Sequence, residues 1–173
     1  MLGDVLLITE DHKKAASGII NYLDKIEGEK IILAVGGESG SGKTEIAHEI
    51  ARVLKSRATP AKVMHIDNYY LTSPAERTPW RQEHGIESIG YSEYDWNTIN
   101  RNLNEFHEGQ DQVTMPCIDL TYHETKKAQF DSGKEPTNDY RWQVLQKEHE
   151  VIQSLRPQAD LLVNKDFSVS PAK

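Results

Sequence analysis

The stretch from Gly37 to Thr44 constrains the fold of this chain more than any other part of its sequence. It reads Gly-Glu-Ser-Gly-Ser-Gly-Lys-Thr, which matches the pattern G-x-x-x-x-G-K-T. An apolar run with β-branched residues precedes it at positions 30–35, as is typical of a buried parallel strand. Apolar residues follow at a helical spacing, at Ile46, Ile50, Val53 and Leu54. The sequence therefore predicts a strand, a glycine-rich loop and a helix in that order.

Such a loop, known as a P-loop, is chemically suited to binding phosphate groups. Glycines let backbone N–H groups turn inward without an interfering Cβ, and the helix N-terminus adds about half a positive charge. Lys43 would reach the terminal phosphates of ATP, and the Thr44 hydroxyl would bind Mg²⁺. The residues expected to bind ATP are Gly37, Glu38, Ser39, Gly40, Ser41, Gly42, Lys43 and Thr44. The alternative is a glycine-rich turn that matches the pattern by chance, but the flanking strand and helix argue against it.

Size and composition limit the classes of protein that this chain can belong to. Its 173 residues suit a single domain, and its net charge of −7 argues against a nucleic-acid-binding surface, because such domains are usually basic. The single cysteine, Cys117, excludes an internal disulfide bond and a cysteine-based zinc site. The sequence shows neither a signal peptide nor an apolar run of about 18 residues, so we expect a cytoplasmic protein without membrane association.

Residues 1–29 are expected to form a helical extension ahead of a P-loop domain at residues 30–173. Its apolar residues are spaced as on one face of a helix, and Gly28 would end that helix. They are Ala15, Ala16, Ile19, Leu23 and Ile26. This face would pack on the core of the domain, and a contact in a homo-oligomer is the alternative.

A second strand is predicted at residues 63–66, directly before Asp67. Ligands of open α/β sheets bind beyond the carboxyl ends of the strands, so Asp67 would lie where an acceptor or Mg²⁺ meets the triphosphate. Its carboxylate could accept a proton from an attacking hydroxyl or help to hold the metal ion. The alternative is a capping role in a helix or turn, which aspartate also favours.

The remaining sequence alternates between helical and strand patterns. Helices are predicted around residues 99–106, ending near Gly109, and around residues 142–152. Further strands are predicted at residues 113–115 and 161–163, and the residues after the last strand are expected to be a loose tail. Together these elements predict a three-layer P-loop NTPase fold of the α/β class, with a mostly parallel sheet and helices on both faces.

Three segments together resemble the uridine kinase and phosphoribulokinase family of P-loop kinases. They are the P-loop, residues 66–70 (Ile-Asp-Asn-Tyr-Tyr) and residues 93–96 (Glu-Tyr-Asp-Trp). In that family the P-loop is followed by a strand ending in D-x-[FY]-[YF], a [FY]-D-[HW] step, a helix and a strand of the I-P type. Met115 and Pro116 stand at the last of these positions, and the similarity covers most of residues 30–164.

The resemblance implies roles for individual residues outside the P-loop. Asp67 would be the general base and a metal-linked carboxylate. Asp95 would hold ribose hydroxyls, and the ring of Tyr94 would lie beside it. Tyr70 would line the acceptor pocket. His123 would contact the base of a nucleoside, although the tyrosine that begins this stretch in the family is absent here.

The sequence departs from the family pattern after Pro116. It lacks a core strand ending in Glu-Gly, whose glutamate helps to hold Mg²⁺ in the family. It also lacks the arginine-rich lid of the family. Residues 119–139 would be either a lid or a plain solvated loop. Residues 118–121 resemble both the end of one strand and the start of a later one. The chain is therefore expected to be joined across an absent stretch of about 30 residues, roughly one β-α unit. True loss of that central strand is the alternative, but it would leave two neighbours without ladder partners. An intact mass near 19.7 kDa would show that the protein does not contain the absent stretch.

Three classes of function follow from these patterns. The leading hypothesis is a kinase that transfers the γ-phosphoryl group of ATP to a small molecule, with uridine or cytidine as the first acceptor and phosphoribulose-like sugars or pantothenate left open. The second class is a P-loop protein that binds nucleotide without nucleoside kinase activity. The third is a GTPase-type switch, because residues 164–166 read Asn-Lys-Asp after a strand. That aspartate comes one residue earlier than in the guanine-reading motif N-K-x-D, and the sequence contains no D-x-x-G.

Overall fold

The computed structural model of the chain describes residues 6–118 and 138–172. Within these residues the chain divides into two compact units. The first, called here the P-loop unit, comprises residues 6–63 and 152–172. The second, called here the central unit, comprises residues 64–118 and 138–151. The predicted ATP-binding residues lie in the P-loop unit, and the predicted acceptor residues Tyr70, Tyr94 and Asp95 lie in the central unit.

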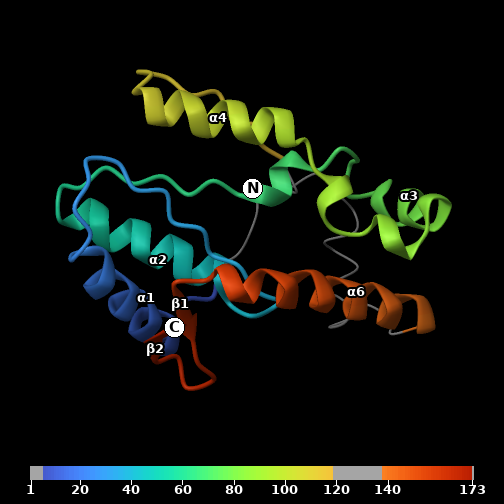
Figure 1. The fold of residues 1–173 in the computed structure, drawn as a ribbon, viewed down its shortest axis with the longest axis horizontal. Helices are drawn as coiled ribbons and strands as arrows, with labels where there is room; N and C mark the ends of the chain where they lie inside the picture. The colour runs from blue at the N-terminus through green and yellow to red at the C-terminus, as the bar shows by residue number, and fades with distance from the viewer. Residues whose placement is uncertain (1–5, 119–137, 173) are drawn as a thin grey trace. The chain divides into compact units, whose positions relative to one another are not determined.

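Two helices, α1 (Glu10–Leu23) and α2 (Lys43–Ser56), pack side by side in the P-loop unit (Figure 1). Two acidic residues in the first turn of α1, Glu10 and Asp11, favour its N-terminus electrostatically. The facing apolar stripes bury six side chains in one core: Ala15, Ala16, Ile19, Ile20, Ile46 and Ile50. The predicted helix of the extension is therefore confirmed, although it ends at Leu23, before the exposed Ile26.

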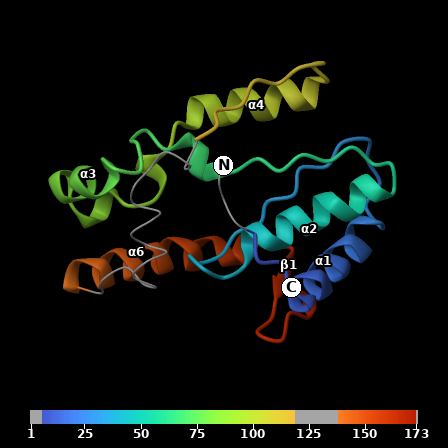
Figure 2. The same ribbon diagram turned by 180° about the vertical axis from the view of Figure 1, so that it is seen from behind.

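A β-hairpin follows the short helix η4 (Arg156–Gln158) in the P-loop unit. Strand β1 (Leu161–Val163), which the sequence predicts, pairs antiparallel with β2 (Val169–Pro171). The hairpin lies next to α1 in both views (Figures 1 and 2). A Cβ at Gly18 would lie 2.7 Å from Cγ2 of Val169, so this close approach of α1 and β2 requires glycine. The expectation of a loose tail is wrong, because these residues form β2.

The central unit consists of short helices and turns around a small set of buried side chains. Its elements are η1 (Ile66–Tyr69), α3 (Arg77–His84), η2 (Ile86–Ser88), η3 (Tyr91–Glu93), α4 (Trp96–Glu108) and most of α6 (Asp139–Leu155). Its buried apolar residues are Tyr69, Ile89, Ile99 and Val144. As predicted, α4 ends next to Gly109, which caps the helix after Glu108 and whose φ of +80° favours glycine. Helix α6, which the sequence predicts around residues 142–152, buries Val144, while Trp142 is 62% exposed.

The predicted, mostly parallel sheet is not seen among the residues that the structure describes. Residues 30–35 and 113–115 have no strand structure, and the segment predicted as a strand at 63–66 runs into η1. Ile32 is 50% exposed, where a buried strand was expected. A strand is stable only when its backbone groups pair with a neighbour, and the sheet found in the described residues consists of β1 and β2. The described part of the chain also contains no helix long and apolar enough to cross a bilayer.

Candidate functional site

The P-loop turns tightly just ahead of α2. Gly40 and Gly42 have φ values of +76° and +83°, in the left-handed region that side chains with a Cβ rarely adopt. The carbonyl oxygen of Glu38 accepts a hydrogen bond from the Ser41 backbone N–H at 3.2 Å. The same oxygen accepts one from the Lys43 ammonium group at 3.2 Å. The loop is thus closed by its own backbone, with the Lys43 side chain folded over it.

The residues of the loop fit the phosphates of a nucleotide. Helix α2 begins at Lys43, so the unpaired N–H groups of its first turn and the positive end of its dipole face the loop. No carboxylate in the described residues pairs with Lys43, so its charge is available to phosphate. Thr44 in the same turn would offer its hydroxyl to Mg²⁺. The described residues hold no cluster of three or more metal-ligating side chains. Nucleotide-bound Mg²⁺ needs few protein ligands, because phosphates and water complete its shell.

The imidazole of His12 on α1 lies against the last glycine of the loop. Its Nδ1 accepts a hydrogen bond from the Thr9 backbone N–H at 3.0 Å, which leaves the ring proton of the neutral form on Nε2. Nε2 lies 2.5 Å from the position that a Cβ would occupy at Gly42. The ring also packs edge-on against Phe167. His12 therefore supports the P-loop, a role that the apolar stripe of the extension did not indicate because His12 is not part of it.

In the central unit the backbone holds Tyr70 and Tyr94 side by side. The two residues form an antiparallel bridge, and the Asp95 backbone N–H donates to the Tyr69 carbonyl oxygen at 2.8 Å. The Tyr94 hydroxyl donates to the Tyr70 hydroxyl at 2.8 Å, and the ring centroids are 4.3 Å apart. Burial raises the pKa of both hydroxyls. The pair therefore stays neutral and cannot act as a base; the Tyr94 O–H is used within the pair, so the Tyr70 O–H is the one that can donate to a ligand.

Asp95, the predicted ribose-binding residue, is also the N-cap of α4. Its Oδ1 accepts from the Thr98 backbone N–H at 3.0 Å, and its Oδ2 accepts from the Thr98 hydroxyl at 2.7 Å. The side-chain hydrogen bond from Thr98 is the main cause of a lowered pKa of Asp95. The carboxylate is therefore ionised and fixed in orientation. Each of its oxygens retains a lone pair for a ligand hydroxyl.

Asp67 lies in η1 with an exposed side chain. Its carboxylate makes no hydrogen bond or ion pair with the residues that the structure describes, so a capping role finds no support. Its neighbours hold η1 in place: the Tyr69 hydroxyl donates to Oδ1 of Asn102 at 2.8 Å. The Asn68 side chain accepts from the Ile118 backbone N–H at 3.2 Å. An unengaged carboxylate on a fixed element is suited to accept a proton or to bind a cation.

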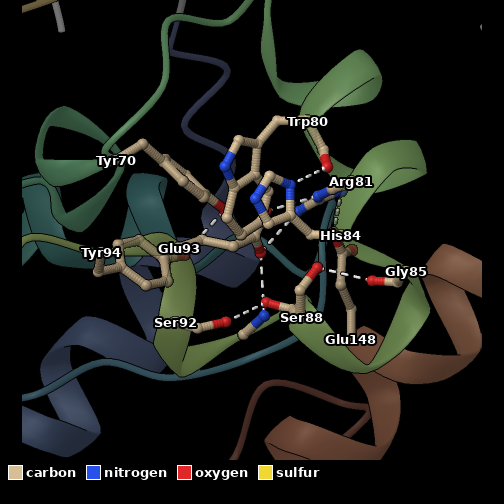
Figure 3. Close-up of polar contacts among 11 residues, drawn as sticks. Tyr70, Trp80, Arg81, His84, Gly85, Ser88, Ser92, Glu93, Tyr94 and Glu148 are labelled. Carbon is tan, nitrogen blue, oxygen red and sulfur yellow. Dashed lines mark hydrogen bonds and ion pairs between the residues drawn. The ribbon is translucent and has the colours of Figure 1, made fainter.

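A buried ion pair between Arg81 and Glu93 supports this region (Figure 3). Two hydrogen bonds join them, Nε to Oε1 at 2.6 Å and Nη2 to Oε2 at 3.0 Å, and the residues are 6% and 3% exposed. Glu93 also accepts from the Gly90 backbone N–H at 2.9 Å, and Glu148 of α6 lies 3.3 Å from Nη1 of Arg81. Burial by itself lowers the pKa of Arg81, but the bonds to Glu93 outweigh it, so the guanidinium stays charged. Glu93 directly precedes Tyr94, so this pair fixes the predicted acceptor residues.

The Arg81→Met variant is expected to lose about 3–5 kcal/mol of unfolding free energy, because it leaves the Glu93 carboxylate buried without its partner. Urea denaturation measures this change. Arg57→Met is the matched control, since Arg57 pairs with Asp24 on the surface at 3.1 Å and should change stability little. Equal effects of the two substitutions would show that the Arg81–Glu93 pair does not hold the central unit together.

Residues 164–166, which resemble a guanine-reading motif, build the turn between β1 and β2. Oδ1 of Asp166 accepts from the Ser168 backbone N–H at 3.1 Å and from its hydroxyl at 2.6 Å. Hydrogen bonding to the Ser168 side chain is the main reason that the pKa of Asp166 falls to about 2. The Asn164 amide donates to the Ser168 hydroxyl at 3.0 Å. The polar groups that would read guanine are engaged in the hairpin turn, which favours a structural role.

The structure brings together some of the predicted site residues and not others. Asp67, Tyr70, Tyr94 and Asp95 all lie in the central unit, and the ATP-binding residues lie in the P-loop unit. His123 and nearly all of the predicted lid at 119–139 fall outside the described residues. Sequence reasoning missed His12, Arg81 and Glu93, since their roles come from contacts between segments that show no joint pattern in the sequence.

Comparison with known proteins identifies relatives of this chain. Residues 32–154 match the model of the Phosphoribulokinase / Uridine kinase family. The uridine kinase of Mycoplasma pneumoniae is 30% identical over 103 residues, which are 60% of this chain and 46% of that protein. The bifunctional alpha-galactosidase/sucrose kinase AgaSK of Mediterraneibacter gnavus is 30% identical over 95 residues, 50% of this chain and 10% of that protein. This chain thus spans less than half the length of each. No solved structure matches it.

The family match covers more than half of the chain. It includes the P-loop, the segment with Asp67 and the segment with Asp95, which are the three parts that the sequence singled out. This chain therefore belongs to the phosphoribulokinase / uridine kinase family of P-loop kinases.

Proposed function

We propose that this protein is an ATP-dependent kinase that transfers the γ-phosphoryl group to a hydroxyl of a small molecule. A nucleoside such as uridine or cytidine is the first candidate acceptor. The observation that carries this proposal is a P-loop at the start of α2 whose lysine has no carboxylate partner in the described residues, in a chain of this kinase family. The similarity to a uridine kinase supports the nucleoside, and Asp95 supports an acceptor with vicinal hydroxyls.

Each predicted site residue has a defined task in such a transfer. The loop N–H groups and Lys43 would bind the phosphates, and the Thr44 hydroxyl would hold Mg²⁺. Asp67 would accept the acceptor's proton, while Tyr70, Tyr94 and Asp95 would orient its hydroxyls. When bound, Mg²⁺ would neutralise charge on the phosphate oxygens, with Asp67 as a further candidate ligand. His123 would contact a nucleobase.

A sugar is the second candidate acceptor. The similarity to a protein that contains a sucrose kinase favours it, and a carboxylate such as Asp95 binds the hydroxyls of a sugar as well as those of a ribose. A phosphoribulose-like sugar and pantothenate stay open as further acceptors. The competing function is nucleotide binding without transfer, because the Glu-Gly carboxylate of the family has no counterpart in this sequence.

The three-layer fold with a mostly parallel sheet is part of the same proposal. It would require the β-α unit that the family carries after the position of Pro116, since that unit supplies a central strand. With that strand in place, residues 30–35 and 63–66 would be able to join the ladder of a parallel sheet.

The test is ADP release from Mg-ATP in the presence of a panel of acceptors: uridine, cytidine, other nucleosides, sucrose, ribulose 5-phosphate and pantothenate. We expect release that depends on uridine or cytidine and is absent from Lys43→Ala. Dependence on sucrose alone would instead establish the sugar as acceptor. ATP binding without release for any acceptor would overturn the kinase proposal in favour of a nucleotide-binding protein.

A further inference from the structure

Helix α3 carries two arginines with different surroundings. Arg81 is saturated by two carboxylates, those of Glu93 and Glu148. Arg77, one turn earlier, forms no ion pair with any residue in 6–118 or 138–172. The carboxylate next to it in the chain, Glu76, instead accepts a hydrogen bond from the Ser73 hydroxyl at 2.7 Å. Arg77 therefore carries a positive charge that the described residues do not neutralise.

The guanidinium of Arg77 is held in a defined plane. Its Cζ lies 3.4 Å from the centroid of the Tyr70 ring, a close cation–π contact. Its Nε is buried and has no hydrogen-bond partner in the described part of the chain. An unsatisfied buried N–H is unfavourable, so a bound acceptor atom would be stabilising there. Stacking on the ring leaves the N–H donors in the plane of the guanidinium, the arrangement that binds an oxyanion through two parallel hydrogen bonds.

Arg77 and Asp67, the predicted general base, share a neighbour in Tyr70. Burial is the main cause of the raised pKa of the Tyr70 hydroxyl. The hydrogen bond from Tyr94 and the positive charge of Arg77 lower this pKa, while the negative charge of Asp67 raises it. Arg77 stacks on the Tyr70 ring, and Asp67 lies in η1, three residues before Tyr70, which is the C-cap of that helix. Tyr70, which would line the acceptor pocket, thus has a cation stacked on its ring and, one turn earlier in the chain, a carboxylate without a partner in the described residues.

Resting on the proposed kinase function, we propose that Arg77 binds the phosphoryl group of the phosphorylated acceptor. In the transfer, the acceptor hydroxyl gives its proton to Asp67 and its oxygen bonds to the γ-phosphorus. The bond between that phosphorus and the oxygen of ADP breaks, and ADP leaves. The new phosphate therefore sits on the oxygen that Asp67 deprotonated, where the planar donors of Arg77 neutralise its charge.

An NMR titration of the Arg77 side chain tests this oxyanion site and does not require the enzyme to turn over. The Nε–H signal of Arg77, assigned by its loss in Arg77→Lys, is followed in ¹⁵N-labelled protein as inorganic phosphate is added. Lys43→Ala is the background, so that phosphate binding at the P-loop is weakened. We expect a saturable shift with phosphate and none with acetate. If the Nε–H signal does not shift when phosphate is added, the proposal is overturned. A shift with acetate alone would mean that Arg77 binds a carboxylate of the acceptor instead.

Product inhibition provides the kinetic test. Arg77→Gln is expected to weaken inhibition by the phosphorylated product roughly tenfold, because charged hydrogen bonds to phosphate are lost, while the KM of the unphosphorylated acceptor changes little. Arg101→Gln is the control, since Arg101 is exposed and pairs only loosely with Glu105 at 3.7 Å. Equal inhibition constants in the wild type and Arg77→Gln would contradict the role of Arg77.

The two tests separate this inference from the proposed function. If the wild type shows no acceptor-dependent turnover, the kinase proposal fails, and the Nε–H titration still decides whether Arg77 binds an oxyanion. If turnover is present and the resonance does not respond to phosphate, the kinase proposal stands and the role of Arg77 is wrong.

Discussion

Replacing Lys43 with alanine is expected to lower acceptor-dependent turnover by about three orders of magnitude or more, with the fold intact. The Lys43 ammonium group folds over the P-loop and, among the residues that the structure describes, bonds only to a backbone carbonyl oxygen, at 3.2 Å. In the proposed reaction, a point charge at this position would stabilise the charge that develops on the transferred phosphoryl group. Its loss is worth about 4 kcal/mol of transition-state stabilisation, which corresponds to about a thousandfold in rate. Steady-state kinetics with saturating acceptor measures the effect.

Lys55→Ala is the control for this substitution. Lys55 lies in the last turn of the same helix, α2, away from the loop. Its removal should leave turnover nearly unchanged, and far-UV circular dichroism should show the same helix content in both variants. A Lys43→Ala protein that retained near-normal turnover would contradict the assignment of residues 37–44 as the phosphate-binding loop.

The second large effect is expected for Asp67→Asn, which should reduce turnover by about 10²–10⁴-fold, the contribution of a general base. The amide cannot take the acceptor's proton, and the carboxylate has no structural bond to lose in the described residues. The affinity for ATP should therefore stay nearly unchanged, as isothermal titration calorimetry would measure.

Asp111→Asn offers a matched control, because Asp111 is exposed in the loop after α4 of the same unit. Unchanged turnover in Asp67→Asn would exclude Asp67 as the base. A parallel loss of stability and turnover would instead point to a structural role in η1.

Local signals in the sequence predicted the parts of the fold that depend on neighbouring residues. Helix α2 follows the P-loop, as its apolar spacing predicts, and Gly109 caps the end of α4. Both signals come from residues that are close together in the sequence. The three segments of the predicted parallel sheet were not found as strands. Strand formation depends on distant partners, and the Glu-Gly strand that would pair with them in the family has no counterpart in this sequence.

The candidate site was predictable in its residue types but not in its supporting contacts. Asp67, Tyr94 and Asp95 could be singled out because they belong to ordered motifs. Arg81 and Glu93 are 12 positions apart in a stretch without periodicity, so their buried pair emerges only when α3 and η3 pack. Hydrophobic patterning carries no information about buried ion pairs, which depend on three-dimensional contacts.

The most direct test of the kinase assignment follows the γ-phosphoryl group itself. The protein is incubated with [γ-³²P]ATP, Mg²⁺ and uridine, and the products are separated. We expect label on the hydroxyl oxygen of the nucleoside, at a rate that Lys43→Ala and Asp67→Asn each reduce. Label found only as inorganic phosphate, with no acceptor carrying it, would contradict the proposal that this protein is a small-molecule kinase.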